Sequence, residues 1–253
     1  MILQRTEESN VLSNAYLVVD EIGGKGVLID ANGATDPLCE RAEREGTDVT
    51  HVLLTHAHWD HVVDVQRVAE RLGAVICAHA DVAREVDGVA ETLADGDELA
   101  VGGLRIQAIA TPGHAAGHLA FLIDGTDCVV GDTLFRGTVA GTLAPGASGF
   151  ADLRRTIMER LLALPPKTRI HPGHREPTTV AAELESNPFV RVWRGLDPEG
   201  TDRCWVGPDP ADQREATLVL WAPDYDGGHK AWVRFPDGED AIVGGSQVRR
   251  TST

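Results

Sequence analysis

Four side chains that can bind a metal ion lie within six residues of one another, in the run His56-Ala57-His58-Trp59-Asp60-His61. The apolar residues 49–55 before it predict a strand, and the apolar spacing of 62–72 after it predicts a helix. A loop between a strand and a helix can direct its side chains into one pocket, and zinc and similar divalent ions prefer imidazole and carboxylate ligands. Because so short a loop cannot easily surround one tetrahedral ion, we expect these ligands to serve two ions.

Three further candidate ligands lie in Gly-containing turns after other predicted strands. His114 follows 104–110, Asp132 follows 128–131, and His174 follows a short strand at 169–170. Since open α/β sheets place their sites at strand ends, we expect these residues to join the first cluster. The predicted ligands then form two sets of three with Asp132 as the bridge: His56, His58 and His114 for one ion, and Asp60, His61 and His174 for the other.

The order of predicted elements indicates a layered α/β domain followed by a smaller part. The predicted strands are 15–20, 26–30, 49–55, 74–78, 104–110, 119–123, 128–131 and 169–170, and the predicted helices are 37–45, 62–72, 152–164 (with Asp152 as its N-cap) and 178–186. Residues 195–213 are rich in Gly, Pro and Asp, which predicts a linker or long loop. Three short antiparallel strands are predicted after it, at 216–221, 229–235 and 240–243. We therefore expect a domain at 1–194 and a linker with a small β-rich extension at 195–253.

Composition excludes several classes of partner. The formal net charge of −16 argues against a nucleic-acid partner, because phosphate binding requires clustered Lys and Arg. The first eight residues lack the basic and apolar regions of a secretory signal, and no apolar run approaches the roughly 18 residues that span a bilayer. The four cysteines form no Cys-x-x-Cys pair, which is typical of reduced thiols. We expect a cytoplasmic protein with no membrane partner and a small-molecule substrate.

The seven candidate ligands resemble the metal-binding pattern of the metallo-β-lactamase fold superfamily over roughly residues 10 to 193. Its His-x-His-x-Asp-His hallmark stands here at residues 56–61, and its later His, Asp and His match His114, Asp132 and His174. Within the superfamily, the stretches 111–118, 131–135 and 171–174 are similar to the glyoxalase II-like (hydroxyacylglutathione hydrolase-like) branch. The resemblance implies an αββα four-layer sandwich, with a site at one sheet edge that holds two zinc ions, or iron or manganese in some members.

Two departures from the family pattern restrict the substrate. The β-lactamases of this fold that use two zinc ions commonly carry Cys where this chain has Asp132, which argues against antibiotic hydrolysis. Glyoxalase II proper carries a helical C-terminal domain that holds glutathione with Lys, Arg and Tyr side chains. Here the C-terminal segment is predicted to be β-structured, contains Tyr225 as its one tyrosine and has no matching basic motif.

The chemistry expected of this site is hydrolysis. Two ions about 3.5–4 Å apart lower the pKa of a shared water, and the bridging hydroxide attacks a carbonyl. Asp132 is expected to bridge the ions and Asp60 to accept the proton or orient the hydroxide. The leading hypothesis is a hydrolase of thioesters of the hydroxyacylglutathione type, or of a related thiol. The alternatives are a persulfide dioxygenase with a single iron, a lactone or phosphodiester hydrolase, and a non-enzymatic metal-binding protein.

Several other residues carry weaker hypotheses. His118 is a candidate for orienting a metal ligand, whereas the remaining histidines, His51, His79, His171 and His229, are predicted to be structural or exposed. The segment 137–149 is rich in Gly, Ala and Thr and is a candidate loop for substrate gating. The resemblance to the family implies that Arg136 and its neighbours lie near the metals. The tryptophans Trp193, Trp205, Trp221 and Trp232 are predicted to form a small core that joins the extension to the main domain, the alternative being that one lines the substrate entrance.

Overall fold

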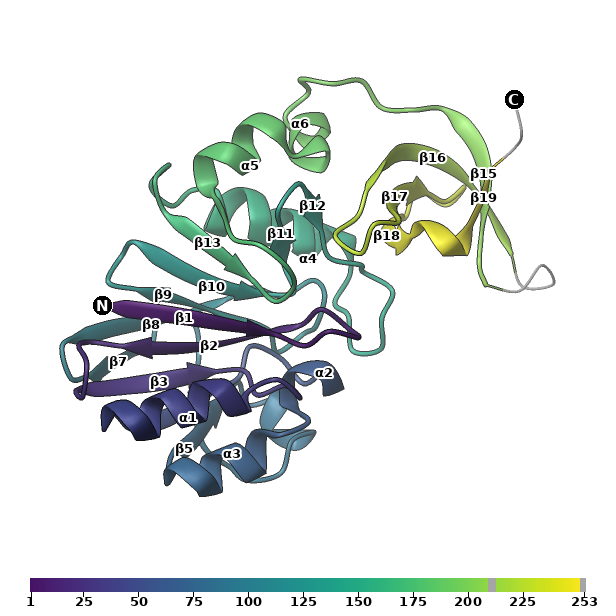
Figure 1. Cartoon of the computed structure of the whole chain (residues 1–253). Helices are drawn as coiled ribbons and strands as arrows, with labels where there is room; N and C mark the ends of the chain where they lie inside the picture. The colour runs from purple at the N-terminus through teal and green to yellow at the C-terminus, as the bar shows by residue number, and fades with distance from the viewer. Residues whose placement is uncertain (209–212, 251–253) are drawn as a thin grey trace.

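Two six-stranded β-sheets face each other in the computed structural model, which describes residues 1–208 and 213–250 (Figure 1). The strands of the first sheet lie in the order β1-β2-β3-β4-β5-β6, with bounds Ile2–Glu7, Asn14–Val19, Lys25–Ile29, Asp48–Leu53, Val75–Ala78 and Val89–Thr92. β1, β2 and β3 pair antiparallel, whereas β3 to β6 are parallel. The parallel connections pass through helices, as parallel pairing requires: α1 (Asp36–Glu45), α2 (Trp59–Val62), α3 (Val65–Leu72) and the 3₁₀ turn Val82–Arg84.

The second sheet has the order β14-β13-β10-β9-β8-β7. Its strands are, in that order, Thr178–Thr179, Arg169–Pro172, Asp127–Gly131, Leu119–Ile123, Leu104–Ala110 and Glu98–Val101. β10 and β13 are its parallel pair. The chain between them forms the small hairpin β11 (Leu134–Phe135) and β12 (Thr138–Val139), then α4 (Phe150–Arg155) and a π-helical segment at Thr156–Leu161.

Each sheet is buried on both faces, and β2 shows how the sequence produces this. Tyr16 and Val18 point into the core between the sheets, whereas Ala15 and Leu17 belong to the core under α1 and α3. A strand covered on both sides reads as an unbroken apolar run, as Asn14–Val19 does after its first residue. Helices α4 and α5 (Val180–Ser186) and the π segment cover the outer face of the second sheet. The predicted αββα sandwich is therefore confirmed.

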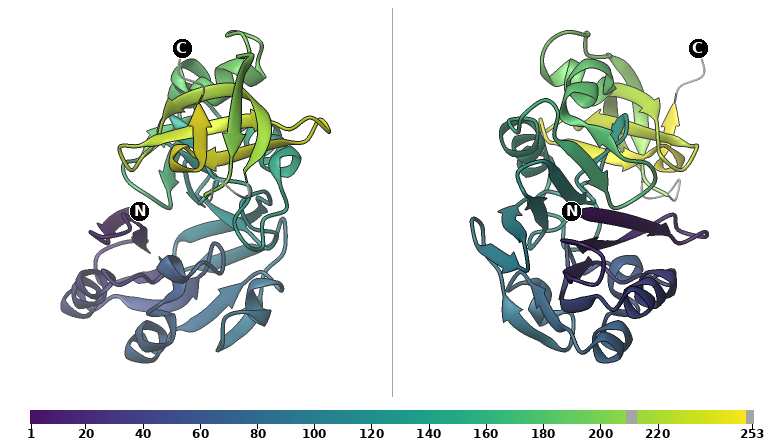
Figure 2. Two further views of the ribbon diagram at one scale, coloured as in Figure 1. Left: turned by 90° about the vertical axis from the view of Figure 1, so that its right-hand side faces the viewer. Right: turned by 60° about the vertical axis from the view of Figure 1, so that its left-hand side comes forward.

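A third sheet of five strands follows the helix α6 (Pro188–Trp193), and Figure 2 shows it facing the viewer in the left panel. Its order is β18-β17-β16-β15-β19, with bounds Asp240–Gly244, His229–Arg234, Arg214–Pro223, Asp202–Val206 and Val248–Arg250, and the 3₁₀ turn Gly245–Gln247 precedes β19. One face encloses its own apolar cluster, which includes Leu218 and Val233. The other face supplies Trp232 and Ile242 to the core of α4 and α6. The C-terminal sheet thus packs directly on the sandwich.

The prediction of a linker or loop at 195–213 was wrong where β15 lies, and its part at 209–212 falls outside the described residues. β15 places Cys204 and Val206 inward, but this short strand stands in a stretch whose Gly, Pro and Asp content is typical of a loop. The edge strands β1 and β19 were also missed, because edge positions tolerate the polar residues that obscure an alternating pattern.

Three predicted helices differ from the observed ones by two or more residues at their N-terminal ends. The helix predicted at 152–164 begins at Phe150, and Asp152 does not cap it but pairs with Arg155 at 2.6 Å. The helix predicted at 62–72 is preceded by the short α2, so that Asp60 and His61 lie on a helical turn. The helix predicted at 178–186 begins at Val180 after a two-residue strand.

Two of the four C-terminal tryptophans join the parts as predicted. Trp193 and Trp232 lie 6.4 Å apart in the shared core, where Phe150 stacks on Trp232 at 5.2 Å. For the other two the prediction was wrong: Trp205 packs against the guanidinium groups of Arg203 and Arg249, and Trp221 stacks on His229. All four cysteines are buried free thiols. Among residues 1–208 and 213–250, no helix combines the length and apolar character needed to cross a membrane.

Candidate metal centre

The structure brings all seven predicted ligands together at one edge of the two sheets. The loop after β4 and the turn of α2 supply four of them, and the second sheet supplies the other three from the segments that follow β8, β10 and β13. The close groups of donor atoms match the two predicted sets: His56, His58 and His114, and Asp60, His61 and His174. A third group, His56, His61 and Asp132, overlaps both sets.

Asp132 lies between the two sets. Its Oδ1 is 3.4 Å from His61 Nε2, and its Oδ2 is 3.2 Å from His174 Nε2 and 3.6 Å from His114 Nε2. Asp60 Oδ2 lies 3.6 Å from both His61 Nε2 and His174 Nε2. The carboxylate of Asp132 therefore lies within reach of ligands from both sets.

In four of the five candidate ligand histidines, Nδ1 faces a protein oxygen. This contact directs Nε2 of the same ring into the centre. His56 Nδ1 faces Thr55 Oγ1 at 3.0 Å, His61 Nδ1 faces Asp30 Oδ2 at 2.9 Å, His114 Nδ1 faces the carbonyl of Gly141 at 2.9 Å, and His174 Nδ1 faces the carbonyl of Val11 at 3.0 Å. His58 is the exception, because its Nδ1 points inward and lies 2.9 Å from His114 Nε2. Partners of this kind fix both the tautomer and the ring orientation of metal ligands.

Asp30 is a functional residue that sequence reasoning missed. It follows β3, is 1% exposed, and accepts hydrogen bonds from the Thr55 amide (2.8 Å) and hydroxyl (2.9 Å) as well as from His61. Because Thr55 in turn holds His56, one carboxylate orients a ligand of each set. The only sequence signal was a buried-strand pattern that ends in an acidic residue.

His118 orients Asp132, which agrees with its predicted supporting role. Its Nε2 accepts a hydrogen bond from the Asp132 amide at 3.1 Å, its Nδ1 lies 2.7 Å from Thr111 Oγ1, and its ring stacks on His56 at 5.0 Å. Burial lowers the pKa of His118 to about 3, so the ring is neutral and able to accept. Gly131 permits this contact, since its φ is +46° and a Cβ there would lie 2.7 Å from His118 Nε2.

Three donor atoms of the site lack hydrogen-bond partners in the described part of the chain, which supports binding of divalent cations independently of the sequence pattern. His56 Nε2, His61 Nε2 and Asp132 Oδ1 are buried and have no hydrogen-bond partner among the described residues. Buried polar atoms are ordinarily satisfied, because an unsatisfied one costs about 1–3 kcal/mol. Ions shared by these atoms would satisfy all three, and imidazole with carboxylate is a zinc-type ligand set.

The two ligand sets differ in the protonation of their histidines. Burial lowers the pKa of His56 well below its ordinary value, so this ring is neutral. Burial also disfavours the charged forms of His61 and Asp132, but the opposite charges beside each of them have the larger effect on its pKa. Asp132 and Asp30 raise the pKa of His61 well above its ordinary value, and His174 with His61 holds the pKa of Asp132 well below its ordinary value. A cation at the Asp60 set therefore has to displace a proton from His61.

The ion at Asp60, His61 and His174 should consequently be lost first on acidification. Below the raised pKa of His61, its affinity should fall by about tenfold per pH unit, because binding releases that proton. At His56 and His114 burial has already lowered the pKa, so the other set should retain its ion to lower pH. Metal analysis after dialysis between about pH 8 and 5 checks this. Loss of both ions at the same pH would contradict it.

Gly173 lies against the ligands so closely that no side chain fits. A Cβ there would overlap Asp132 Oδ1 and lie 2.9 Å from both His61 Cε1 and the Gly131 backbone. Gly173→Ala should therefore displace Asp132 and lower metal affinity by about 10- to 100-fold, measured by competition with a chelator. Gly33→Ala is the matched control, since a Cβ there meets only Glu8 Cγ at 3.6 Å. Equal affinity in both variants would show that Asp132 does not need its observed position.

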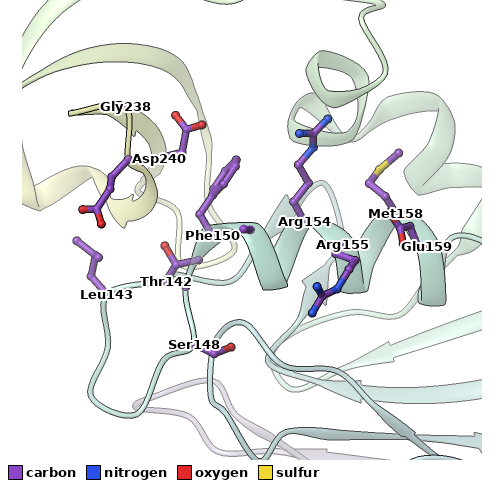
Figure 3. A pocket seen from close by; sticks show the side chains of 13 residues that line it. Thr142, Leu143, Ser148, Phe150, Arg154, Arg155, Met158, Glu159, Gly238 and Asp240 are labelled. Atoms are coloured by element: carbon purple, nitrogen blue, oxygen red, sulfur yellow. The ribbon is translucent and has the colours of Figure 1, made fainter. Parts of the chain in front are cut away.

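Two cavities adjoin residues 141–149, which are part of the segment 137–149 that was predicted to gate substrate. A cavity of about 510 Å³ is lined by His58, Ala116 and Pro145 and reaches the candidate ligands. A larger one of about 830 Å³ lies between this segment, α4 and the turn at Gly238 (Figure 3), and none of the seven ligands lines it. Of these two cavities, the smaller is the one that a candidate ligand, His58, lines.

The segment 141–149 is tied to ligand-bearing loops rather than free of them. Gly141 holds His114, the Gly146 carbonyl accepts from the Ala116 amide at 2.9 Å, and the amides of Ser148 and Gly149 donate to the Gly113 carbonyl at 3.1 Å. Gating by this segment stays a prediction. Arg136 is exposed, and its neighbour Phe135 contacts His174 instead, with ring centroids 5.7 Å apart.

The remaining histidines have ordinary structural surroundings. His171 Nε2 lies 2.8 Å from Asp127 Oδ1, and His229 is exposed beside Trp221. His51 lies near Cys77 and Glu91 on neighbouring strands of the first sheet. Burial raises the pKa of Cys77 to about 12, so its thiol is neutral, and we assign no metal to this group.

Comparison with known proteins agrees with this geometry. Residues 10–174 match the family described as the metallo-beta-lactamase superfamily, and the segment contains all seven candidate ligands. An uncharacterised protein of Mycobacterium leprae is 35% identical over 203 residues, which cover 70% of this chain and 93% of that protein. A hydroxyacylglutathione hydrolase of Rhizobium meliloti is 34% identical over 175 residues, which cover 69% of this chain and 64% of that protein.

Solved structures give the same assignment. ETHE1 from Myxococcus xanthus superposes with a TM-score of 0.69 and 29% identity, over 75% of this chain and 84% of that chain. TTHA1623, solved in a di-iron-bound form, superposes with a TM-score of 0.63 and 34% identity, over 74% of this chain and 99% of that chain. The match to the family model confirms the predicted superfamily. Members of this superfamily bind divalent metals and are mostly hydrolases. The chain belongs to the metallo-beta-lactamase superfamily.

Proposed function

We propose that this chain is a hydrolase with two divalent metal ions, most simply zinc, that cleaves small-molecule thioesters of the hydroxyacylglutathione type. The observation that carries the proposal is the pair of three-ligand sets with Asp132 between them. Similarity to the Rhizobium meliloti hydroxyacylglutathione hydrolase supports the thioester. We assign catalysis to the domain formed by residues 1–194. We assign to residues 195–253 the role of an extension that shapes the site. Four free thiols are in keeping with a cytoplasmic location.

The chain's own residues account for orientation and proton transfer. Two ions held by the seven ligands would lower the pKa of a water toward neutrality and polarise a carbonyl oxygen. Asp60 is the more exposed of the two ligand carboxylates, with a side chain 15% exposed against 8% for Asp132. Its Oδ2 faces His61 and His174. Its Oδ1 is therefore the atom we assign to accept a proton from the attacking water.

The decisive experiment measures metal content and substrate range on the same preparation. Protein loaded with zinc, iron or manganese is analysed for ions per chain and assayed with lactoylglutathione, a second acyl thioester, a lactone, and glutathione persulfide under oxygen. We expect two ions per chain and a kcat/KM for a thioester at least about tenfold above that for the lactone. His58→Ala provides the blank for contaminating esterases.

Two results would overturn the proposal. Binding of a single iron with oxygen consumption on the persulfide would make the chain a dioxygenase. No hydrolysis of any thioester or ester by protein that holds two ions would refute the hydrolase assignment altogether.

A further inference from the structure

The turn between β16 and β17 places an aromatic side chain directly on a candidate metal ligand. The ring of Tyr225 lies nearly parallel to the imidazole of His174, with centroids 4.6 Å apart and an interplanar angle of 19°. Tyr225 also contacts Phe135, with centroids 4.7 Å apart. This turn belongs to the C-terminal sheet, outside the segment 10–174 that matches the family. The sheet therefore contributes a wall to the candidate site.

The turn is held in place at several points. Asp224 and Lys230 form an ion pair at 2.9 Å, with side chains only 6% and 10% exposed. Asp224 Oδ1 also accepts a hydrogen bond from the Tyr225 amide at 2.8 Å, and Arg175 Nε, beside His174, donates to the Tyr225 carbonyl at 3.2 Å. Breaking a buried pair by removing one partner is costly, so the pair restricts the turn to this conformation.

The hydroxyl of Tyr225 has no hydrogen-bond partner among the described residues and is not one of the buried atoms that lack a partner, so it is accessible to a ligand although the residue is half-buried. Partly buried tyrosines usually use their hydroxyl. The imidazole on which the ring stacks is itself at the centre, because His174 Nε2 lies 3.2 Å from Asp132 Oδ2 and 3.6 Å from Asp60 Oδ2. A hydrogen-bond donor thus stands at the site without a protein acceptor.

We propose that Tyr225 is a substrate-binding residue whose hydroxyl donates a hydrogen bond to an oxygen on the acyl half of the substrate. The inference rests on the proposed function, because a carbonyl attacked between the two ligand sets lies next to His174 and its stacked tyrosine. The ring fixes the donor in position, and the hydroxyl selects acyl groups that offer an acceptor. The C-terminal sheet thereby determines part of the specificity of a centre that the sandwich builds.

The test uses Tyr225→Phe in the full chain, because phenylalanine keeps the stacking on His174 and removes only the hydroxyl. We expect kcat/KM for lactoylglutathione to fall by about tenfold, mainly through KM, with metal content and Tm unchanged. Binding of lactate, the acyl half after cleavage, should weaken by a similar factor in calorimetry with metal-loaded protein. If Tyr225 had a purely structural role, its substitution would lower Tm and would leave KM and the affinity for lactate unchanged. Trp205→Phe, on β15 of the same sheet, is the control and should leave lactate binding unchanged.

The outcomes separate this inference from the proposed function. Equal lactate affinity in wild type and Tyr225→Phe, or no lactate binding by wild type, overturns the role of Tyr225 whatever the activity. Absence of thioester hydrolysis by wild type overturns the proposed function, and a selective loss of lactate binding in Tyr225→Phe would then still support Tyr225 as a contact for oxygen-bearing ligands.

Discussion

Asp132→Asn should lower kcat/KM by at least about 10³-fold and leave one metal ion per chain in place of two. Asp132 lies within 3.6 Å of ligands from both sets, His114 of one and His61 and His174 of the other. An amide keeps the shape of the carboxylate but has one oxygen and no charge, so it cannot bridge two cations. Metal analysis and steady-state kinetics on the same sample measure both effects.

The controls for Asp132→Asn show whether the variant is folded and whether the effect is specific to this aspartate. Thermal unfolding should show a folded variant, and Asp48→Asn, at an exposed carboxylate near Lys25, should keep full activity and two ions. Asp60→Ala and His58→Ala should abolish turnover in the same way while the fold survives. Near-wild-type activity in a well-folded Asp132→Asn protein would exclude the bridging role and the mechanism built on it.

Asp30→Ala should lower both stability and metal affinity, although Asp30 is not a candidate ligand. Removal of its carboxylate leaves the Thr55 amide and hydroxyl and His61 Nδ1 without an acceptor in a buried site. The free energy of unfolding should fall by about 3 kcal/mol or more, because each unsatisfied buried donor costs about 1–3 kcal/mol. Metal affinity should fall by about 10- to 100-fold, since both His56 and His61 lose orientation. Denaturation of metal-free protein and chelator competition measure the two effects separately.

Asp20→Ala is the matched control for Asp30→Ala. Asp20 also accepts hydrogen bonds from backbone amides, those of Glu21, Lys25 and Gly103, but at an exposed turn. It should destabilise the protein less and leave metal affinity unchanged. If Asp30→Ala retained metal as well as Asp20→Ala does, orientation of His61 by Asp30 would be irrelevant to binding.

The ligands were predictable from the sequence because their signal is local. The run 56–61 and the Gly-containing turns around His114, Asp132 and His174 each combine a strand end with a metal-binding side chain. Asp30 was not predictable in this way, since its role depends on β3 and β4 pairing in the register that brings Asp30 to Thr55. A partner that acts through tertiary contact leaves no spacing pattern in the chain.

The C-terminal sheet was also only partly predictable from local sequence. β16, β17 and β18 were predicted from their apolar runs, but the edge strand β19 was not, because charged side chains at an edge obscure the pattern, and β15 was not, because it lies in a stretch whose composition is typical of a loop. The contact of Tyr225 with His174 joins residues far apart in the chain. It follows from the packing of the sheet on α4 and α6, which no residue near Tyr225 encodes by itself.

Each ligand set is divided between the two sheets in the same proportion. His56 and His58 come from the loop after β4 and are completed by His114, and Asp60 and His61 come from the same stretch and are completed by His174. Neither sheet alone holds three ligands for one ion. Tight metal binding therefore has to wait until the sheets have docked, which makes loading a late event in folding. Ions bound to these sets would link the N-terminal half of the chain to the rest and would stabilise the docked state of the two sheets in proportion to their affinity.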